Sequence, residues 1–200
     1  AVGDTPPTIA AAGALSADPG AAKADADSLW RVYSMTKPIT AMAAMMLIED
    51  GKLGLDQPIG DFIPGFKSMK VLTDPANSLA SRPAARTITV RHLLTHTAGL
   101  GYTIITKGPL LAEYNRLGLA PAALAPAMEP ELRKVRPTSL KDFADRVAMA
   151  PLIADPGTVW SYSIGLDALA RLREVAGGRP FETFVATRLF KPVGMTSGYW

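Results

Sequence analysis

Ser34 and Lys37 stand three residues apart at the start of an apolar segment, a spacing that could activate a serine hydroxyl without histidine. The run 35–49, MTKPITAMAAMMLIE, is rich in Ala, Met and Leu and contains no glycine, so it predicts a helix. Its proline, Pro38, falls in the first turn, where a missing N–H is tolerated. Since residues i and i+3 share a helix face, we expect the Lys37 amine within hydrogen-bond reach of the Ser34 hydroxyl. The N–H groups and positive dipole end of the helix would favour negative charge beside Ser34.

A Ser-x-x-Lys spacing also has a plainer interpretation. A serine that caps a helix, followed by a surface lysine, gives the same pattern, and short motifs arise by chance. Tyr162 is a third candidate, because the polar loop 156–163, PGTVWSYS, can present a phenol to a cleft. A nearby phenol could share the proton that Ser34 must lose. Taken alone, Tyr162 is more typical of a packed tyrosine whose hydroxyl is satisfied.

His92 and His96 are the only histidines, and their i,i+4 spacing in HLLTH can bind zinc. Leu93 stands where the H-E-x-x-H motif has its general-base glutamate, and no acidic third ligand lies nearby in the sequence. Structural hydrogen bonding is therefore favoured over a metal site. A Ser-His-Asp triad stays open, because its members are distant in sequence, although no G-x-S-x-G motif occurs. We expect neither a metal nor an organic cofactor.

Composition limits the classes of partner. A chain of 200 residues with 48% hydrophobic content can bury one sizeable core or part of a larger one. The net charge is only +3, and the basic run 133–136 is short and lies among prolines, so no nucleic-acid site is expected. The apolar stretch 39–48 is too short to span a bilayer. The absence of cysteine excludes disulfides and thiolate chemistry and leaves the compartment open, with a cytoplasmic location slightly favoured over a periplasmic one.

Local patterns predict mainly helices, separated by Pro/Gly-rich connectors. Short strands are expected at 8–15 and 29–33. Residues 66–86 read as loop and residues 101–137 as irregular chain with five prolines, which could wall a substrate cleft. The predicted helices cover 35–49, 92–94 with flanking residues, 140–149, 165–176 and 181–190.

Several segments in order resemble the serine β-lactamase and penicillin-binding-protein superfamily, in particular its class C β-lactamase-like and family VIII carboxylesterase branch. Any one of these motifs is weak, but their order and approximate spacing fit the family from about residue 8 onward. The matching segments are SMTK at 34–37, LDQPI at 55–59, TVRHLLTHTAGL at 89–100, PGT with WSYS at 156–163, and FKPVGM at 190–195.

The resemblance implies an α+β fold of the β-lactamase/transpeptidase-like type, with an all-helical subdomain beside an α/β subdomain built on an antiparallel sheet. Residues 1–34 would supply N-terminal strands of the α/β subdomain. Residues 35–200 would form the nucleophile helix and the helical subdomain with its cleft-lining loops. The family's third motif lies downstream of Trp200, so we expect a partial copy whose remaining α/β strands are not in this chain.

The resemblance also implies roles for the candidate residues. Ser34 would form a covalent acyl-enzyme, Lys37 would be the general base and Tyr162 would relay the proton. The Ser34 backbone N–H would be one oxyanion donor, and the second would come from a strand outside this chain. The expected partners are a small-molecule ester substrate and the remainder of the same enzyme. A separate chain is one of the forms in which that remainder could occur.

One position departs from the lactamase pattern, which has Tyr-x-Asn where this chain has Tyr162-Ser163-Ile164. Isoleucine cannot offer the amide hydrogen bonds that asparagine gives to a substrate. We therefore predict a serine carboxylesterase that hydrolyses small carboxylic esters. A β-lactamase or D-alanyl-D-alanine carboxypeptidase, an acyltransferase, and a non-catalytic binding protein on the same fold remain as alternatives.

Overall fold

The computed structural model describes residues 5–6, 8–120 and 126–199, and it divides the chain into two compact units. The first unit is Ala1–Met35 and the second is Thr36–Trp200. The second unit holds every α-helix that the structure describes, together with a two-stranded antiparallel sheet. None of the helices in the described ranges is long and apolar enough to cross a bilayer.

The strands expected at 8–15 and 29–33 do not form. In the described part of the first unit, the only β pairing is the isolated antiparallel bridge between Ala14 and Lys23. The unit ends in the 3₁₀-helix η1, Tyr33–Met35. The prediction was wrong for these segments because an extended segment becomes a strand only when a neighbour pairs with its N–H and C=O groups.

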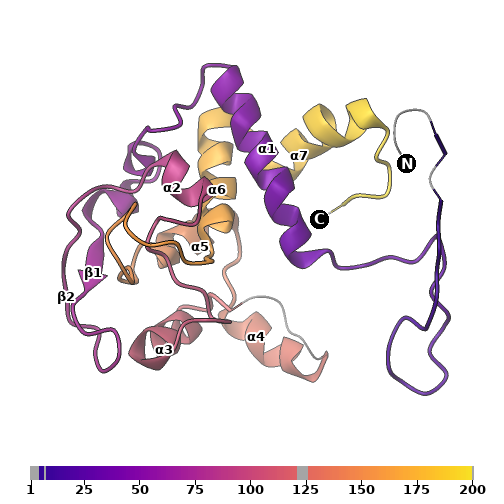
Figure 1. Cartoon of the computed structure of the whole chain (residues 1–200), viewed down its shortest axis with the longest axis horizontal. Coiled ribbons are helices and arrows are strands. Elements are labelled where there is room, and N and C mark those ends of the chain that lie inside the picture. The colour runs from indigo at the N-terminus through magenta and orange to yellow at the C-terminus, as the bar shows by residue number, and fades with distance from the viewer. Residues whose placement is uncertain (1–4, 7, 121–125, 200) are drawn as a thin grey trace. The chain divides into compact units, whose positions relative to one another are not determined.

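The predicted helix over 35–49 is confirmed as α1, Thr36–Glu49. Its C-terminus is closed by two reverse hydrogen bonds, from Gly51 N–H to the Ile48 carbonyl (3.0 Å) and from Lys52 N–H to the Leu47 carbonyl (2.9 Å). Its buried face packs beside α6, Gly165–Gly177, which is the predicted helix over 165–176 (Figure 1). That face consists of Thr40, Ala43, Ala44 and Leu47.

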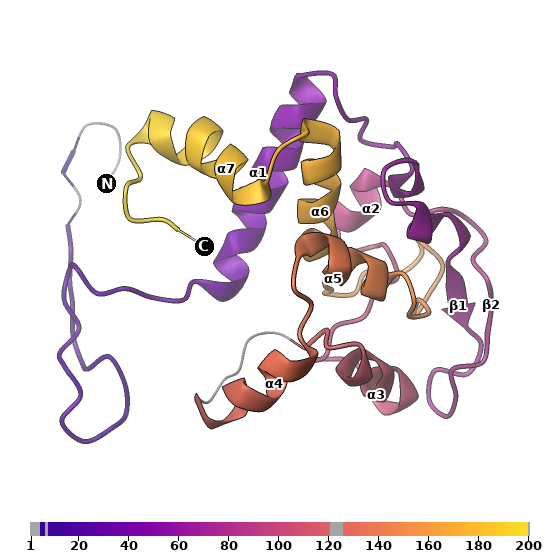
Figure 2. The ribbon, with the colours of Figure 1, turned by 180° about the vertical axis from the view of Figure 1, so that it is seen from behind.

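Helices α2, α5 and α7 pack against α6, and α7 also contacts α1 (Figure 2). The α-helices are α2 Val90–Leu94, α3 Gly108–Arg116, α4 Glu129–Val135, α5 Leu140–Val147 and α7 Phe181–Val185. The shorter turns are the 3₁₀-helices η2 Ile59–Asp61, η3 Pro64–Ser68, η4 Pro126–Met128 and η6 Lys191–Val193, and the π-helical turn η5 Ala186–Phe190. The predicted helix over 181–190 therefore forms as α7 continued by η5.

Two segments predicted as loop contain regular structure. Within 66–86, β1 Lys70–Leu72 pairs antiparallel with β2 Ser81–Pro83. Within 101–137, α3 and α4 form, each with a proline in its first turn. Proline disrupts the interior of a helix, but in the first turn its missing N–H would have no partner in the helix anyway, so these prolines are compatible with both helices.

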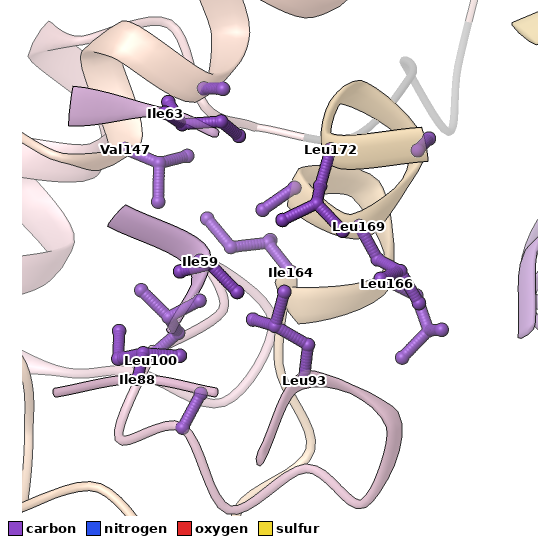
Figure 3. Packing of buried hydrophobic residues seen from close by; sticks show 14 of the residues in the cluster. Ile59, Ile63, Ile88, Leu93, Leu100, Val147, Ile164, Leu166, Leu169 and Leu172 are labelled. Atoms are coloured by element: carbon purple, nitrogen blue, oxygen red, sulfur yellow. The ribbon is translucent and has the colours of Figure 1, made fainter. Parts of the chain in front are cut away.

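The core of the second unit gathers side chains from α2, α5, α6 and the intervening loops (Figure 3). Leu93 of α2, Val147 of α5 and Leu169 of α6 are all fully buried. Ile164, directly before α6, lies in the same cluster and is 2% exposed. This core fixes the loops around residues 96–102 and 156–164, which carry the site described next.

Candidate active site

An amine and two phenols meet at the first turn of α1. The Nζ atom of Lys37 lies 4.8 Å from the ring centroid of Tyr162 and 5.4 Å from that of Tyr102. The two tyrosine rings are themselves 5.6 Å apart. An ammonium over an aromatic face is attracted by the ring quadrupole. The structure thus brings together two of the three residues predicted from the sequence, although they are 125 positions apart in a chain of 200.

Ser34, the third predicted residue, lies in η1, immediately before α1. It belongs to the Ala1–Met35 unit, whereas Lys37 belongs to the second. The preceding residue, Tyr33, has a φ of 42°, in the left-handed region that side chains with a Cβ rarely adopt. Backbone of this kind is frequent at functional sites. The role of Ser34 as nucleophile remains a prediction.

Tyr162 is held by backbone pairing between segment 156–164 and the loop after α2. The Gly157 N–H donates to the Thr97 carbonyl (2.7 Å), and the Ile164 N–H donates to the Gly101 carbonyl (3.2 Å). Just before this segment, the Asp155 carboxylate accepts hydrogen bonds from the Arg82 side chain of β2 (2.6 Å) and from the Ala85 N–H (2.7 Å). These contacts determine where the phenol lies.

His96 borders Tyr162, with ring centroids 4.8 Å apart. The Ser163 N–H donates to its Nδ1 (3.2 Å), so the imidazole takes part in a structural hydrogen bond, as the sequence favoured. Burial lowers the pKa of His96, and the nearby Lys37 ammonium lowers it further. The sequence placed His96 in a family motif but gave no indication that it lies beside Tyr162.

Tyr102 and Asp167 are members of this group that sequence reasoning missed. Burial raises the pKa of the Tyr102 phenol to about 12, with smaller contributions from Asp167 and Tyr162. Asp167 lies in the first turn of α6 and is exposed. Desolvation by the neighbouring protein raises the pKa of its carboxyl, while the Lys37 ammonium acts in the opposite direction. No motif marked either residue, since only the fold brings them to Lys37.

His92 serves a structural purpose at the start of α2. Its Nδ1 accepts a hydrogen bond from the Thr89 N–H (3.2 Å), and Thr89 Oγ1 accepts one from the His92 N–H (3.4 Å), so the two form a capping box. Among the residues that the structure describes, no three His, Cys, Asp or Glu side chains are placed to hold a metal ion. The geometry of His92 therefore supports helix capping.

Ile164 is 2% exposed and belongs to the hydrophobic core. Its side chain lies in the hydrophobic cluster with Leu93 and Leu166 (Figure 3). The position that carries asparagine in the lactamase pattern is thus part of the core. No amide from this position can meet a substrate.

An apolar hollow of about 390 Å³ is lined in part by Ser161, the residue before Tyr162. It opens between the β1–β2 hairpin and the start of α3. Its lining residues are Leu72, Pro75, Ala76, Ile105, Thr106, Lys107, Leu110, Ile153 and Ser161. A hollow of this size and character can take the hydrocarbon part of a small molecule.

Comparison with known proteins decides the family. A family model described as Beta-lactamase matches residues 3–200. The chain belongs to the beta-lactamase family. This match confirms the predicted superfamily. Among the relatives, the esterase EstB of Burkholderia gladioli is 35% identical over 169 residues, which are 84% of this chain and 38% of that protein. The acyltransferase calJ of Penicillium decumbens is 34% identical over 192 residues, or 94% of this chain and 41% of that protein.

The fold of this beta-lactamase-family chain agrees with that assignment. A penicillin-binding protein from Bacillus halodurans superposes with a TM-score of 0.68 at 24% identity, over 99% of this chain and 51% of its own. The predicted β-lactamase/transpeptidase-like fold is therefore confirmed. The chain spans about two fifths of the length of the curated relatives that it matches.

Proposed function

We propose that this chain supplies the nucleophile and the proton-transfer pair of a serine carboxylesterase. The observation that carries the proposal is the Lys37 amine 4.8 Å from the ring centroid of Tyr162, at the helix turn that follows Ser34. A phenol close to an amine can relay a proton to it once the hydroxyl comes within hydrogen-bond reach, and a serine must lose a proton in order to attack a carbonyl. The esterase name of a 35% identical relative supports the same class.

In this mechanism the Ser34 Oγ attacks the carbonyl carbon of the ester, and its proton passes to the Lys37–Tyr162 pair. The oxyanion is held by the Ser34 N–H and by a second hydrogen-bond donor. The bond to the alcohol breaks, and the alcohol leaves with the proton that the pair returns. Water then attacks the acyl-enzyme in the same way and releases the carboxylic acid.

Transfer of the acyl group to an alcohol is the second candidate. The same acyl-enzyme would be formed, and an alcohol would attack it in place of water. The observation that favours it is the acyltransferase name of calJ, which matches 94% of this chain. The apolar hollow beside Ser161 gives either reaction room for the hydrocarbon part of a substrate.

Hydrolysis of a short-chain p-nitrophenyl ester by the full-length protein tests the proposal. We expect Ser34→Ala to abolish nitrophenol release and to abolish the mass increase of one acyl group that the wild type shows on mixing with the ester. Ser28→Ala is the matched control, since Ser28 lies in the same unit and its hydroxyl donates to Asp25 (2.9 Å). Unchanged turnover in Ser34→Ala would show that Ser34 is not the nucleophile.

Adding butanol to the same assay separates the two reactions. A hydrolase gives mainly the free acid, whereas an acyltransferase gives mainly the butyl ester. Chromogenic cephalosporin turnover that exceeded ester turnover would replace both candidates with a β-lactamase.

A further inference from the structure

His96 adopts a left-handed backbone conformation, which is uncommon for non-glycine residues although histidine adopts it more often than most. Its φ is 56°, and apart from Tyr33 it is the only non-glycine residue with positive φ among those that the structure describes. The left-handed region is unfavourable for residues with a Cβ, and such conformations persist only where the surroundings impose them. The contacts of His96 show what imposes it.

His96 accepts hydrogen bonds from the residues on either side of Tyr162 in the sequence. Its backbone carbonyl accepts a hydrogen bond from the Ser161 N–H (2.9 Å), and its Nδ1 accepts one from the Ser163 N–H (3.2 Å). The centroid of the imidazole ring lies 4.8 Å from that of the Tyr162 ring, and the two ring planes are tilted by 45° to each other. The left-handed conformation allows both the carbonyl and the ring of one residue to reach the same short segment.

The hydrogen bond from the Ser163 N–H assigns the tautomer of the neutral ring. A backbone N–H can only donate, so Nδ1 carries no proton and the neutral imidazole has its proton on Nε2. The Ser163 hydroxyl, which is 1% exposed, accepts from the Gly165 N–H (3.2 Å) and lies 3.1 Å from the same Nδ1. Ser163 therefore links the imidazole to the first residue of α6.

The surroundings of His96, its burial first and the nearby Lys37 charge second, favour the same neutral imidazole. The titratable groups gathered here are Lys37 from α1, Tyr162 and Tyr102 from the two loops, and Asp167 from α6. Burial and the Lys37 ammonium both lower the pKa of His96. A proton on Nδ1 would remove the acceptor for the Ser163 N–H and would put a second cation beside Lys37.

We propose that His96 is a positioning residue, whose Nδ1 and backbone carbonyl hold the Tyr162 phenol against the Lys37 amine. The inference rests on the proposed function, because it gives His96 a purpose in the Lys37–Tyr162 proton transfer. It goes further by assigning a role to a residue that would not itself touch the substrate. Loss of the Nδ1 acceptor frees Ser163 and lets the phenol move.

The test compares two variants of the full-length protein with the short-chain p-nitrophenyl ester as substrate. His96→Ala removes the acceptor, and we expect kcat to fall about tenfold to hundredfold with little change in KM, as for a misplaced catalytic group. His96→Asn keeps an acceptor oxygen near the position of Nδ1, tolerates the left-handed backbone and does not titrate. It should recover most of the lost kcat.

His92→Asn is the matched control, because His92 Nδ1 also accepts a backbone N–H but caps α2. We expect its kcat to equal that of the wild type. The inference would be overturned if His96→Ala kept the wild-type kcat. It would also be overturned if His96→Asn lost as much kcat as His96→Ala. Ser34→Ala assayed beside them separates the two claims, since activity retained in that variant would refute the proposed function itself.

The pH profile gives a readout that a merely structural histidine would not change. The wild-type kcat should fall when the pH drops below the usual histidine range of about 6.5, because His96 then gains a proton and loses its acceptor. In His96→Asn this fall should disappear or move to lower pH. An identical acid limb in both proteins would contradict the proposal, and this comparison still decides the matter if His96→Ala does not fold.

Discussion

The Lys37 amine lies 4.8 Å from the ring centroid of Tyr162, so residues from the first turn of α1 and from the loop before α6 share one small volume. The packing of α1 beside α6 makes this possible (Figure 1). An ammonium over the face of a tyrosine ring is a cation–π contact, and it keeps the amine beside the phenol that the proposed proton transfer requires. The chemistry proposed for this chain depends on that contact.

Removal of either member of the pair should impair ester turnover strongly. We expect Lys37→Met and Tyr162→Phe each to lower kcat/KM by about 10²–10⁴-fold, the usual contribution of a positioned acid or base. Initial rates with a p-nitrophenyl ester measure the effect, and Lys52→Met, at the other end of α1, serves as the control. A loss below tenfold in Lys37→Met would remove lysine from the mechanism.

The same substitution at Tyr102 should have a much smaller effect. Burial holds the pKa of Tyr102 at about 12, so its phenol stays protonated at every pH used for assay and cannot act as a base. Tyr102→Phe keeps the ring that faces Lys37 and loses only the hydroxyl. We expect less than about a tenfold loss of kcat, well below that of Tyr162→Phe. Equal losses in the two variants would mean that the roles of the tyrosines are misassigned.

Restoring the lactamase asparagine should destabilise the protein without creating a lactamase. Ile164 is 2% exposed and packs in the core, so Ile164→Asn would bury an amide without partners. An unsatisfied buried polar group costs about 1–3 kcal/mol. Urea unfolding should show this loss, and a chromogenic cephalosporin should give no new turnover. A stable variant that hydrolyses the cephalosporin would show that position 164 can face the site.

Alanine substitutions at two glycines with positive φ distinguish the cost of backbone strain from the cost of a steric clash. Both Gly99 and Gly178 have positive φ, of 76° and 66°. A Cβ at Gly178 would meet nothing within 4 Å, so Gly178→Ala should cost only about 1–2 kcal/mol for the left-handed backbone. A Cβ at Gly99 would lie 2.1 Å from the Ala154 carbonyl oxygen, so the backbone would have to move.

We therefore expect Gly99→Ala to destabilise by more than about 4 kcal/mol, a loss that places it among the exceptional substitutions. Chemical denaturation of both variants measures the difference. Similar denaturation midpoints for the two variants would indicate that the backbone of the loop before Gly101 can shift at little cost in free energy. The hydrogen bonds of this loop would then hold the site less rigidly than the structure suggests.

Local rules predicted those elements that depend on neighbours in the chain. The helices predicted over 35–49, 140–149 and 165–176 follow from local patterns, and the structure contains them as α1, α5 and α6. Ser139 Oγ accepts from the Asp142 N–H (3.1 Å) and so caps α5. The same rules failed for β1 and β2, because two three-residue strands carry little local signal and form only by pairing.

The family, the helix that begins after Ser34, and the candidates Lys37 and Tyr162 can all be inferred from the linear sequence. The gathering of Lys37, Tyr102, Tyr162, His96 and Asp167 in one place is visible only in the folded chain. The reason is physical: caps and helices arise from contacts within a few residues, whereas this group is assembled by burying α1 against α6 and by pairing loop 96–101 with segment 156–164. No spacing along the chain encodes those contacts.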